Sequence, residues 1–459
     1  MIGATYRLQF RNGVDFRRAA ELAPTLARRG ITHLYASPVF AATSGSTHGY
    51  DVTDHNAFDP TLGGEEGFRH MCAALHAAGL KLILDIVPNH MAASPENGWW
   101  HDVLRHGRSS SFAGHFDIDW TAPKLVLPIL GKPFGDALSA GESTRGEAPD
   151  GTPRLSVPGH VLPLAPGTET ISDIAALHEA QHYRVAHWRL GRDGLTYRRF
   201  FEITGLVGVC VEKTAVFDDV HRLLEDLVRE GLVHGVRVDH VDGLADPSAY
   251  LSRLSERLDV PVLIEKIVEA GEALPPWPVA GTTGYEFIAA MAALLVDGAG
   301  LEALSKEYRA IGNDDVGALV RAAKREMVRH NFAGEHSRLG QLAEGAFAQD
   351  LAKRDHGPST LRDGLEALLS AMPDYRTYLR PRAEEPSPRD RAVVAEAVAG
   401  AGRQKLDTPQ VVDDLAALLL NPPRVQEADE FVTRFQQLSG PVMAKAVEDT
   451  VFFRHHRFL

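Results

Sequence analysis

The sequence predicts an α/β fold: a (β/α)8-type TIM barrel, about six strands of it evident, with an insertion after strand three and an α-helical inserted region. Short apolar runs rich in β-branched residues alternate with helical patterns, as in β-α-β units. Three of these runs end at Asp85, Asp239 and Glu265. The carboxyl ends of barrel strands share the face that carries catalysis. The chain has 459 residues, 44% of them hydrophobic, which exceeds one ordinary compact domain.

The barrel elements follow from hydrophobic pattern and turn residues. Short runs with flanking turn residues read as buried strands. The predicted strands cover residues 5–10, 31–36, 80–87, 232–238, 260–264 and, as a short sixth strand, 278–281. Amphipathic periods, several of them followed by glycine, read as helices. The predicted helices between the strands cover residues 16–29, 65–78, 215–229 and 247–258.

The regular alternation fails in two regions, which sets the predicted domain organisation. After residue 89 a long irregular connection contains several tryptophans and a stretch rich in Gly, Pro and Ser. Connections of this length are usually functional or form a small inserted domain. After residue 285 amphipathic helices follow one another, for example at 300–311, 316–330, 359–372 and 409–420. The predicted parts are a barrel N-terminal part (1–88), an insertion (89–199), barrel strands four to six (200–285) and a mainly helical region (286–459).

Composition limits the possible partners and the location. The net charge of −13 argues against binding to a nucleic-acid backbone, which requires clustered Lys and Arg. Two cysteines, Cys72 and Cys210, do not make a disulfide framework and indicate a reducing compartment. We find neither a signal peptide nor an apolar stretch long enough for a bilayer. The expectation is a cytoplasmic protein without a membrane partner.

The acids at the strand ends suggest work on a glycosidic bond. In retaining glycosidases a carboxylate nucleophile and a carboxyl acid lie about 5–5.5 Å apart, and acids on adjacent strands about 4.8 Å apart can reach that separation. Asp239 and Glu265 are the candidate pair. Arg237, two residues before Asp239, shares its side of the strand and is expected to keep that carboxylate ionised. The alternative is that these acids are ordinary strand-end residues that make caps and salt bridges.

Further polar residues could hold a sugar. Asn89 and His90 follow the strand that contains Asp85, and both can donate hydrogen bonds to hydroxyl groups. After the second strand, Tyr50 could stack on a sugar ring and Asp51 could accept from hydroxyls. The Trp99-Trp100 pair could form an aromatic platform or pack in the core. The sequence contains neither a phosphate-binding loop nor a His-Glu-x-x-His pair, so we predict no metal and no cofactor.

These residues resemble the α-amylase superfamily, glycoside hydrolase family 13. Asp85 with Asn89-His90 is similar to its first conserved region, Arg237-x-Asp239 to its second and Glu265 to its third. Within the superfamily the sequence most resembles the maltooligosyltrehalose synthase family. The segments that carry this resemblance are residues 5–9, 45–52, 85–91, 116–120, 197–201, 239–244, 279–285 and 440–445. Together they extend over essentially the whole chain.

The resemblance implies an intramolecular transglycosylation in trehalose biosynthesis. The reducing-end α-1,4 linkage of a maltooligosaccharide would become an α,α-1,1 linkage. Asp239 would be the nucleophile and Glu265 the general acid/base. The implied substrate-binding residues are Tyr50, Asp51, Asp85, Asn89, His90, Arg237 and His240. Two alternatives stay open: another glucan hydrolase or glucanotransferase of the superfamily, or a non-catalytic glucan-binding remnant.

One feature of the family is missing from this sequence. Family members carry a fourth conserved region, a His-Asp pair on the seventh strand, and we find no equivalent before Leu459. The expectation is therefore a C-terminally truncated chain, unstable and nearly inactive when isolated. A separately encoded C-terminal part is the expected protein partner, besides the α-glucan substrate.

Overall fold

The computed structural model describes residues 2–148, 151–268, 271–311, 315–402 and 404–455. The chain divides into two compact units. The first comprises Met1–Val241, Ala249–Glu265 and Trp277–Thr283. The second comprises Asp242–Ser248, Lys266–Pro276 and Gly284–Leu459. The four-part domain division made from the sequence stays a prediction.

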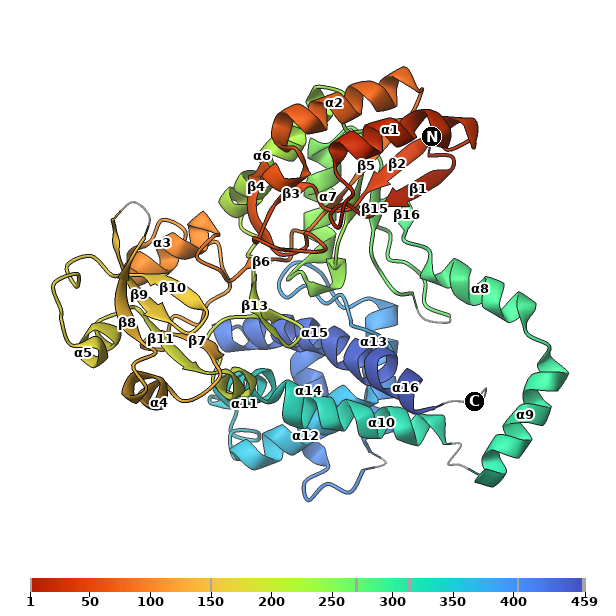
Figure 1. Ribbon diagram of the computed structural model, residues 1–459. Helices are drawn as coiled ribbons and strands as arrows, with labels where there is room; N and C mark the ends of the chain where they lie inside the picture. Colours follow the sequence, from red (N-terminus) through yellow and green to blue (C-terminus); the bar gives the residue numbers. More distant parts are fainter. Residues whose placement is uncertain (1, 149–150, 269–270, 312–314, 403, 456–459) are drawn as a thin grey trace. The chain divides into compact units, whose positions relative to one another are not determined.

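The first unit contains a six-stranded parallel sheet (Figure 1). In spatial order its strands are β1 (Thr5–Leu8), β2 (His33–Ala36), β5 (Lys81–Ile86), β14 (Gly235–Val238), β15 (Val262–Ile264) and β16 (Gly281–Thr282). Each adjacent pair runs parallel. The strand order follows the chain, as it does in a (β/α)8 barrel. The expected barrel-type sheet is confirmed, and the sixth strand lies slightly later in the chain than expected.

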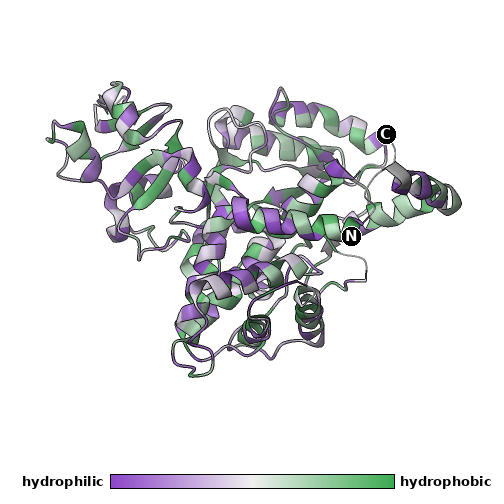
Figure 2. Cartoon of the chain, turned by 90° about the horizontal axis from the view of Figure 1, so that it is seen from below, coloured by the Kyte–Doolittle hydropathy of each residue, from purple (hydrophilic) through white to green (hydrophobic). Residues whose placement is uncertain are grey.

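Amphipathic helices connect these strands. They are α1 (Phe16–Arg28), α2 (Gly64–Ala77), α6 (Thr214–Arg229) and α7 (Pro247–Arg257), close to the predicted bounds. In α1 the residues at helical spacing from Phe16 to Leu26 are buried, and Asp15 caps the first turn by accepting from the amide of Arg18 at 2.7 Å. Hydrophilic and hydrophobic residues alternate around the helices, as amphipathic packing requires (Figure 2).

A hairpin between β2 and α2 was not predicted. It pairs β3 (Phe40–Ala42) with β4 (Val52–Phe58) in antiparallel register. Asp54, His55 and Asn56 interrupt the apolar pattern of β4, so this strand lacks the uniform signal of the barrel strands. The loop of the hairpin carries Tyr50 and Asp51 toward the carboxyl ends of the sheet strands.

The region after β5 contains short strands and helices that the sequence pattern did not reveal. Its strands form three small sheets with the orders β10-β9-β8, β11-β7 and β12-β13-β6. Its elements are β6 (His90–Ala92), α3 (Gly98–His106), β7 (Leu125–Leu130), α4 (Phe134–Ser139), β8 (Thr144–Glu147), β9 (Pro153–Val157), β10 (His160–Pro163), α5 (Ile174–Glu179), β11 (Tyr183–His187), β12 (Arg199–Phe200) and β13 (Ile203–Gly208). Since β13 pairs with β6, the chain returns beside the place where it left the barrel sheet.

The second unit is mainly helical, as expected. Its helices are α8 (Tyr285–Leu295), α9 (Gly298–Ile311), α10 (Val316–Glu326), α11 (Ala333–Phe347), α12 (Pro358–Ala371), α13 (Pro388–Ala401), α14 (Gln410–Leu420), α15 (Gln426–Ala446) and α16 (Phe452–Arg454), with π-helical turns η5 (Met327–Asn331) and η6 (Val447–Val451). Buried apolar side chains from α10 through η6 form one continuous core.

Helix α8 differs from the helices of that core because its apolar side chains are exposed, among them Phe287, Leu294 and Leu295. Within the described residues, no single helix has the length and apolar composition needed to cross a membrane. Helices α8 and α9 together meet that criterion, but they are bent by 89° relative to each other.

Candidate active site at the strand ends

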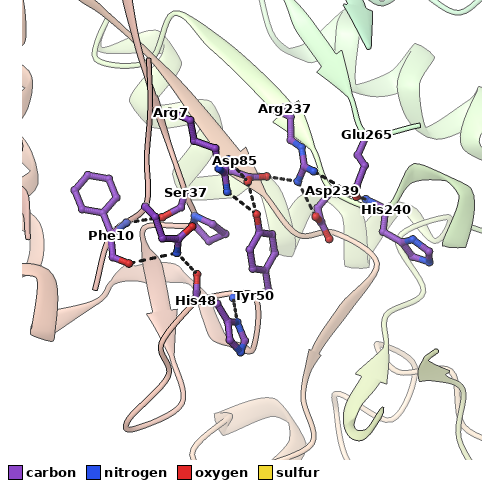
Figure 3. A network of polar contacts seen from close by, with 12 residues as sticks. Arg7, Phe10, Ser37, His48, Tyr50, Asp85, Arg237, Asp239, His240 and Glu265 are labelled. Atoms are coloured by element: carbon purple, nitrogen blue, oxygen red, sulfur yellow. Dashed lines mark hydrogen bonds and ion pairs between the residues drawn. The ribbon is translucent and has the colours of Figure 1, made fainter. Parts of the chain in front are cut away.

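Arg237 links the three predicted acids at the carboxyl ends of the sheet strands (Figure 3). Its Nη1 lies 2.6 Å from Oδ1 of Asp85 and 2.6 Å from Oδ1 of Asp239. Its Nη2 lies 3.1 Å from Oε1 of Glu265. Arg237 and Asp85 are direct partners in the β14–β5 register, whereas Asp239 and Glu265 follow the last paired residues of β14 and β15. The structure thus brings together four of the predicted site residues.

Asp85 is also held from its other side. Its Oδ2 accepts from the hydroxyl of Tyr50 at 2.7 Å and from Nη1 of Arg7 at 3.0 Å. Arg7 Nη2 donates to the Tyr50 hydroxyl at 2.8 Å. With both oxygens bonded and almost no exposed surface, Asp85 supports the site rather than presenting a reactive group.

The side chain of Glu265 contacts the backbone of His240. The amide of His240 donates to Oε2 of Glu265 at 2.8 Å. His240 adopts a left-handed conformation with φ of 49°, and so does Phe201, also at 49°. Their rings lie 5.2 Å apart. Non-glycine residues in this conformation carry strain and concentrate at functional sites.

His90 is buried, and its Nε2 has no hydrogen-bond partner among the residues that the structure describes. Its ring lies 4.3 Å from that of Phe200, which also contacts the ring of His240 at 5.0 Å. Burial lowers the pKa of His90, so the neutral imidazole is the favoured form. Phe200 thus joins two predicted sugar-binding histidines.

Asn89 and Asp51 lie outside the Arg237 network. The side chain of Asn89 is buried, and its Oδ1 accepts from Nη1 of Arg198 at 2.9 Å. Asp51 accepts from the hydroxyls of Thr43 and Ser46 within its own loop. Both residues bond to neighbouring side chains, and no described contact joins either one to Asp239 or Glu265.

The charges of the cluster shift its proton equilibria. Burial, followed by the Glu265 carboxylate, raises the pKa of Asp239 well above its ordinary value, and Arg237 opposes the shift. This direction is opposite to the expectation that Arg237 would keep Asp239 ionised. Burial alone would lower the pKa of Arg237, but Asp85, Asp239 and Glu265 raise it. Two permanent cations, Arg7 and Arg237, therefore face three carboxyl groups, and this imbalance favours retention of a proton within the cluster.

Two further expectations concern aromatic residues and metals. Trp100 is fully buried, with its ring 5.2 Å from that of Phe116, and Trp99 stacks on Phe112 at 5.6 Å. The core-packing alternative is therefore correct for Trp100. Among the described residues, no group of three or more His, Cys, Asp or Glu side chains is arranged to hold a metal ion.

Comparison with known proteins bears on the type of site. The family model "Alpha amylase, catalytic domain" matches residues 24–144. A protein of Mycobacterium tuberculosis described as a putative maltooligosyl trehalose synthase is 39% identical over 99% of this chain, and the alignment covers 57% of that protein. The structure of maltooligosyltrehalose synthase from Arthrobacter ramosus aligns with a TM-score of 0.86 at 38% identity, covering 99% of this chain and 57% of that one. A hypothetical maltooligosyl trehalose synthase from Sulfolobus tokodaii aligns with a TM-score of 0.82 at 30% identity, covering 100% and 57%.

The resemblance to maltooligosyltrehalose synthases is therefore confirmed. The barrel is of the α-amylase catalytic-domain type, with helical and small-sheet additions. The chain spans 57% of the length of these synthases.

Three residues of the strand-end cluster were missed by the sequence analysis as members of the site. Arg7 supports Asp85 and Tyr50, and Phe200 and Phe201 pack on His90 and His240. A usable signal existed for Arg7, because an arginine inside a predicted barrel strand requires a buried or strand-end partner. All three residues lie in segments that already carried the resemblance to the synthases.

Proposed function

We propose that this chain carries the catalytic face of a (1→4)-α-D-glucan 1-α-D-glucosylmutase. The reaction would convert the reducing-end α-1,4 linkage of a maltooligosaccharide into an α,α-1,1 linkage. The observation that carries the proposal is the contact of Arg237 with Asp85, Asp239 and Glu265, all within 3.1 Å, at adjacent strand ends. The similarity to the synthases over 99% of the chain supports the choice among glucan-active enzymes.

In the first step Asp239 is the nucleophile. One of its carboxylate oxygens forms a bond to the anomeric carbon of the penultimate glucose while the bond from that carbon to the leaving O4 breaks. Glu265 gives its proton to that O4. The released glucose stays bound and turns. Its anomeric hydroxyl then attacks the same carbon and loses its proton to Glu265, which frees Asp239.

The cluster supports a mechanism that needs one acid and one nucleophile because crowded, buried carboxyl groups favour retention of one proton, whereas the assignment of the two roles rests on the resemblance to the synthases. General acid catalysis requires a carboxyl group that keeps a proton near neutral pH. Burial and the neighbouring Glu265 carboxylate raise the pKa of Asp239, so one proton is retained in the cluster more readily than on an isolated carboxylate. Arg237 bonds to both groups, so it can stabilise whichever of them is ionised at each step.

The remaining predicted residues would bind the sugar. Nε2 of His90 is buried and unpartnered, which suits a hydrogen bond to a substrate hydroxyl. Tyr50 and His240 border the carboxylates through Asp85 and Glu265. For Asn89 and Asp51 we propose support of His90 and of the Tyr50 loop. Phe200 and Phe201 supply apolar surface that would keep water from the covalent intermediate.

The test is incubation of maltopentaose with the purified chain supplied with the predicted C-terminal part, followed by a reducing-end assay and chromatography of chain length. The proposed reaction removes reducing ends while the pentasaccharide length is kept. Shorter products would overturn the proposal in favour of a hydrolase or glucanotransferase. No reaction, with an intact circular dichroism spectrum, would exclude the activity for this chain. The α-glucan substrate, a separate C-terminal partner and the cytoplasmic location stay predictions.

A further inference from the structure

Two adjoining pockets in the first unit share Arg108 and Trp120. One has a volume of about 410 Å³ and is also lined by Asp117 and Lys213. The other has a volume of about 310 Å³ and is also lined by Asp119. No member of the Arg237 network lines either pocket. Volumes of this size suit small-molecule binding.

The indole of Trp120 is fixed at its edge and borders both pockets. Its Nε1 donates to the carbonyl of Ala113 at 3.2 Å. The guanidinium carbon of Arg108 lies 6.0 Å from the ring centroid. A rigid aromatic wall shared by two pockets of similar size suits a ligand made of repeating units, with one unit on each side.

The polar groups of the pockets present both donors and acceptors. Arg108 is exposed and forms no hydrogen bond or ion pair with any residue that the structure describes. Asp117 is anchored by Nε of Arg198 at 2.8 Å, and Lys213 by the carbonyl of Gly114 at 2.8 Å. Sugar hydroxyls both donate and accept, and sugar C–H faces pack on aromatic rings.

Other ligand classes fit less well. An anion would meet the cations Arg108 and Lys213, and Lys124, which is already paired with Glu179, but it would be repelled by the carboxylates of Asp117 and Asp119. An apolar ligand would leave these charged groups without water or partners. A neutral, hydroxyl-rich chain is not repelled by the carboxylates, and its hydroxyl groups can bond to the charged side chains.

We propose that these pockets bind a segment of linear α-1,4-glucan, at a site separate from the strand-end carboxylates, with successive sugar units on either side of Trp120. Only the α-1,4 linkage rests on the proposed function. The aromatic and polar residues of the pockets favour a neutral oligosaccharide whether or not the proposed function is correct.

The test is calorimetric titration of maltoheptaose into the Asp239→Asn chain, which should bind glucan without turnover. We expect two binding events. Adding Trp120→Ala should weaken one of them by roughly tenfold or more, since aromatic contacts and buried area are lost together. Adding Arg108→Ala should weaken the same event by roughly threefold to tenfold. The matched control is Trp188→Ala, because Trp188 is a 49% exposed tryptophan that also has an arginine nearby, Arg189 at 5.4 Å. The Trp188→Ala variant should show both binding events with unchanged affinity.

Three outcomes would overturn the proposal: a single binding event, equal effects of Trp120→Ala and Trp188→Ala, or a second event that inorganic phosphate abolishes and that depends on Arg108. Because Arg108 is exposed and unbonded, Arg108→Ala tests the site even where Trp120→Ala lowers stability. Shortening of maltopentaose by the wild-type chain would refute the proposed function while leaving the second binding event in place, so the two failures are distinguishable.

Discussion

Arg237 and Arg376 are both buried arginines, but they bind different kinds of partner. Arg237, in the sheet unit, contacts the carboxylates of Asp85, Asp239 and Glu265. Arg376, in the helical unit, donates from Nη1 to the backbone carbonyls of Asp242 at 2.7 Å and Leu244 at 2.8 Å. Carboxylates can exchange protons and form covalent bonds, whereas backbone carbonyls mainly fix the path of the chain. Partner type therefore separates a candidate reactive site from a structural one.

The largest expected effect is on activity and comes from the Arg237 network. Asp239→Asn should reduce the conversion of maltopentaose by roughly 10³-fold or more, because the amide cannot act as the nucleophile. The folded state should be retained, as measured by circular dichroism and thermal melting. Asp54→Asn, at an exposed carboxylate of β4, is the matched control and should keep full activity. Comparable losses in both variants would remove Asp239 from its proposed role.

The second expected effect is on stability and comes from Arg376. Arg376→Met keeps much of the side-chain volume but removes the donor to three backbone carbonyls, those of Asp242, Leu244 and Thr377, so we expect a loss of about 2–5 kcal/mol. Denaturant unfolding measures it. The control is Arg391→Met, where a 47% exposed arginine pairs with Glu385 and the change should stay within about 0.5 kcal/mol. Equal losses would mean that the carbonyl contacts of Arg376 do not hold the chain path.

The third effect tests the residue that the sequence analysis missed. Arg7→Ala should lower kcat/KM by roughly 10- to 100-fold, because Tyr50 and Asp85 lose a shared donor and the site loses its alignment. Steady-state kinetics with maltopentaose would show it. Arg7→Lys should recover part of the loss, since it restores the charge but cannot bond both partners as the guanidinium does. An unchanged kcat/KM in Arg7→Ala would show that Arg7 does not align the site and that Arg237 alone holds the carboxylates.

The smallest expected effect is on the pH dependence of the free energy of unfolding. Since the pKa of Asp239 is raised from its ordinary value of 3.8, the folded state prefers the protonated form, and stability falls as pH rises from 3.8 through the raised pKa. Asp239→Asn lacks this titration. Its free energy of unfolding, relative to wild type, should therefore increase over that window, by about 1.4 kcal/mol for each pH unit. Denaturant titrations at several pH values measure it. A difference that does not change with pH would contradict the raised pKa.

The barrel part of the fold was predictable because each of its strands carries a clear signal in its own few residues. The apolar, β-branched runs before Asp85, Asp239 and Glu265 must be buried, and parallel pairing then places their ends on one face. The folded region between β5 and α6 was not predictable, because its short strands pair over long distances with little alternation. The predicted helix bounds were close to the observed ones where an N-cap such as Asp15 marks the first turn or a glycine follows the last turn.

The candidate site was predictable where strand register decides it. Arg237 and Asp85 face each other because they are register partners. Tyr50 and Asp51 show the limit: they are adjacent in one loop, yet the Tyr50 hydroxyl reaches Asp85 while Asp51 bonds to Thr43 and Ser46. Which of two neighbouring side chains faces the site depends on loop torsions, and the residue types alone do not specify these.

The left-handed backbone at Phe201 and His240 has a consequence for protein engineering. Glycine at either position would release torsional strain of about 1 kcal/mol or more, which offsets much of the entropy that glycine adds to the unfolded chain. The same change deletes a ring that packs at the carboxylate cluster. Selection for turnover should therefore keep the ring at these two positions, although glycine suits the backbone conformation better.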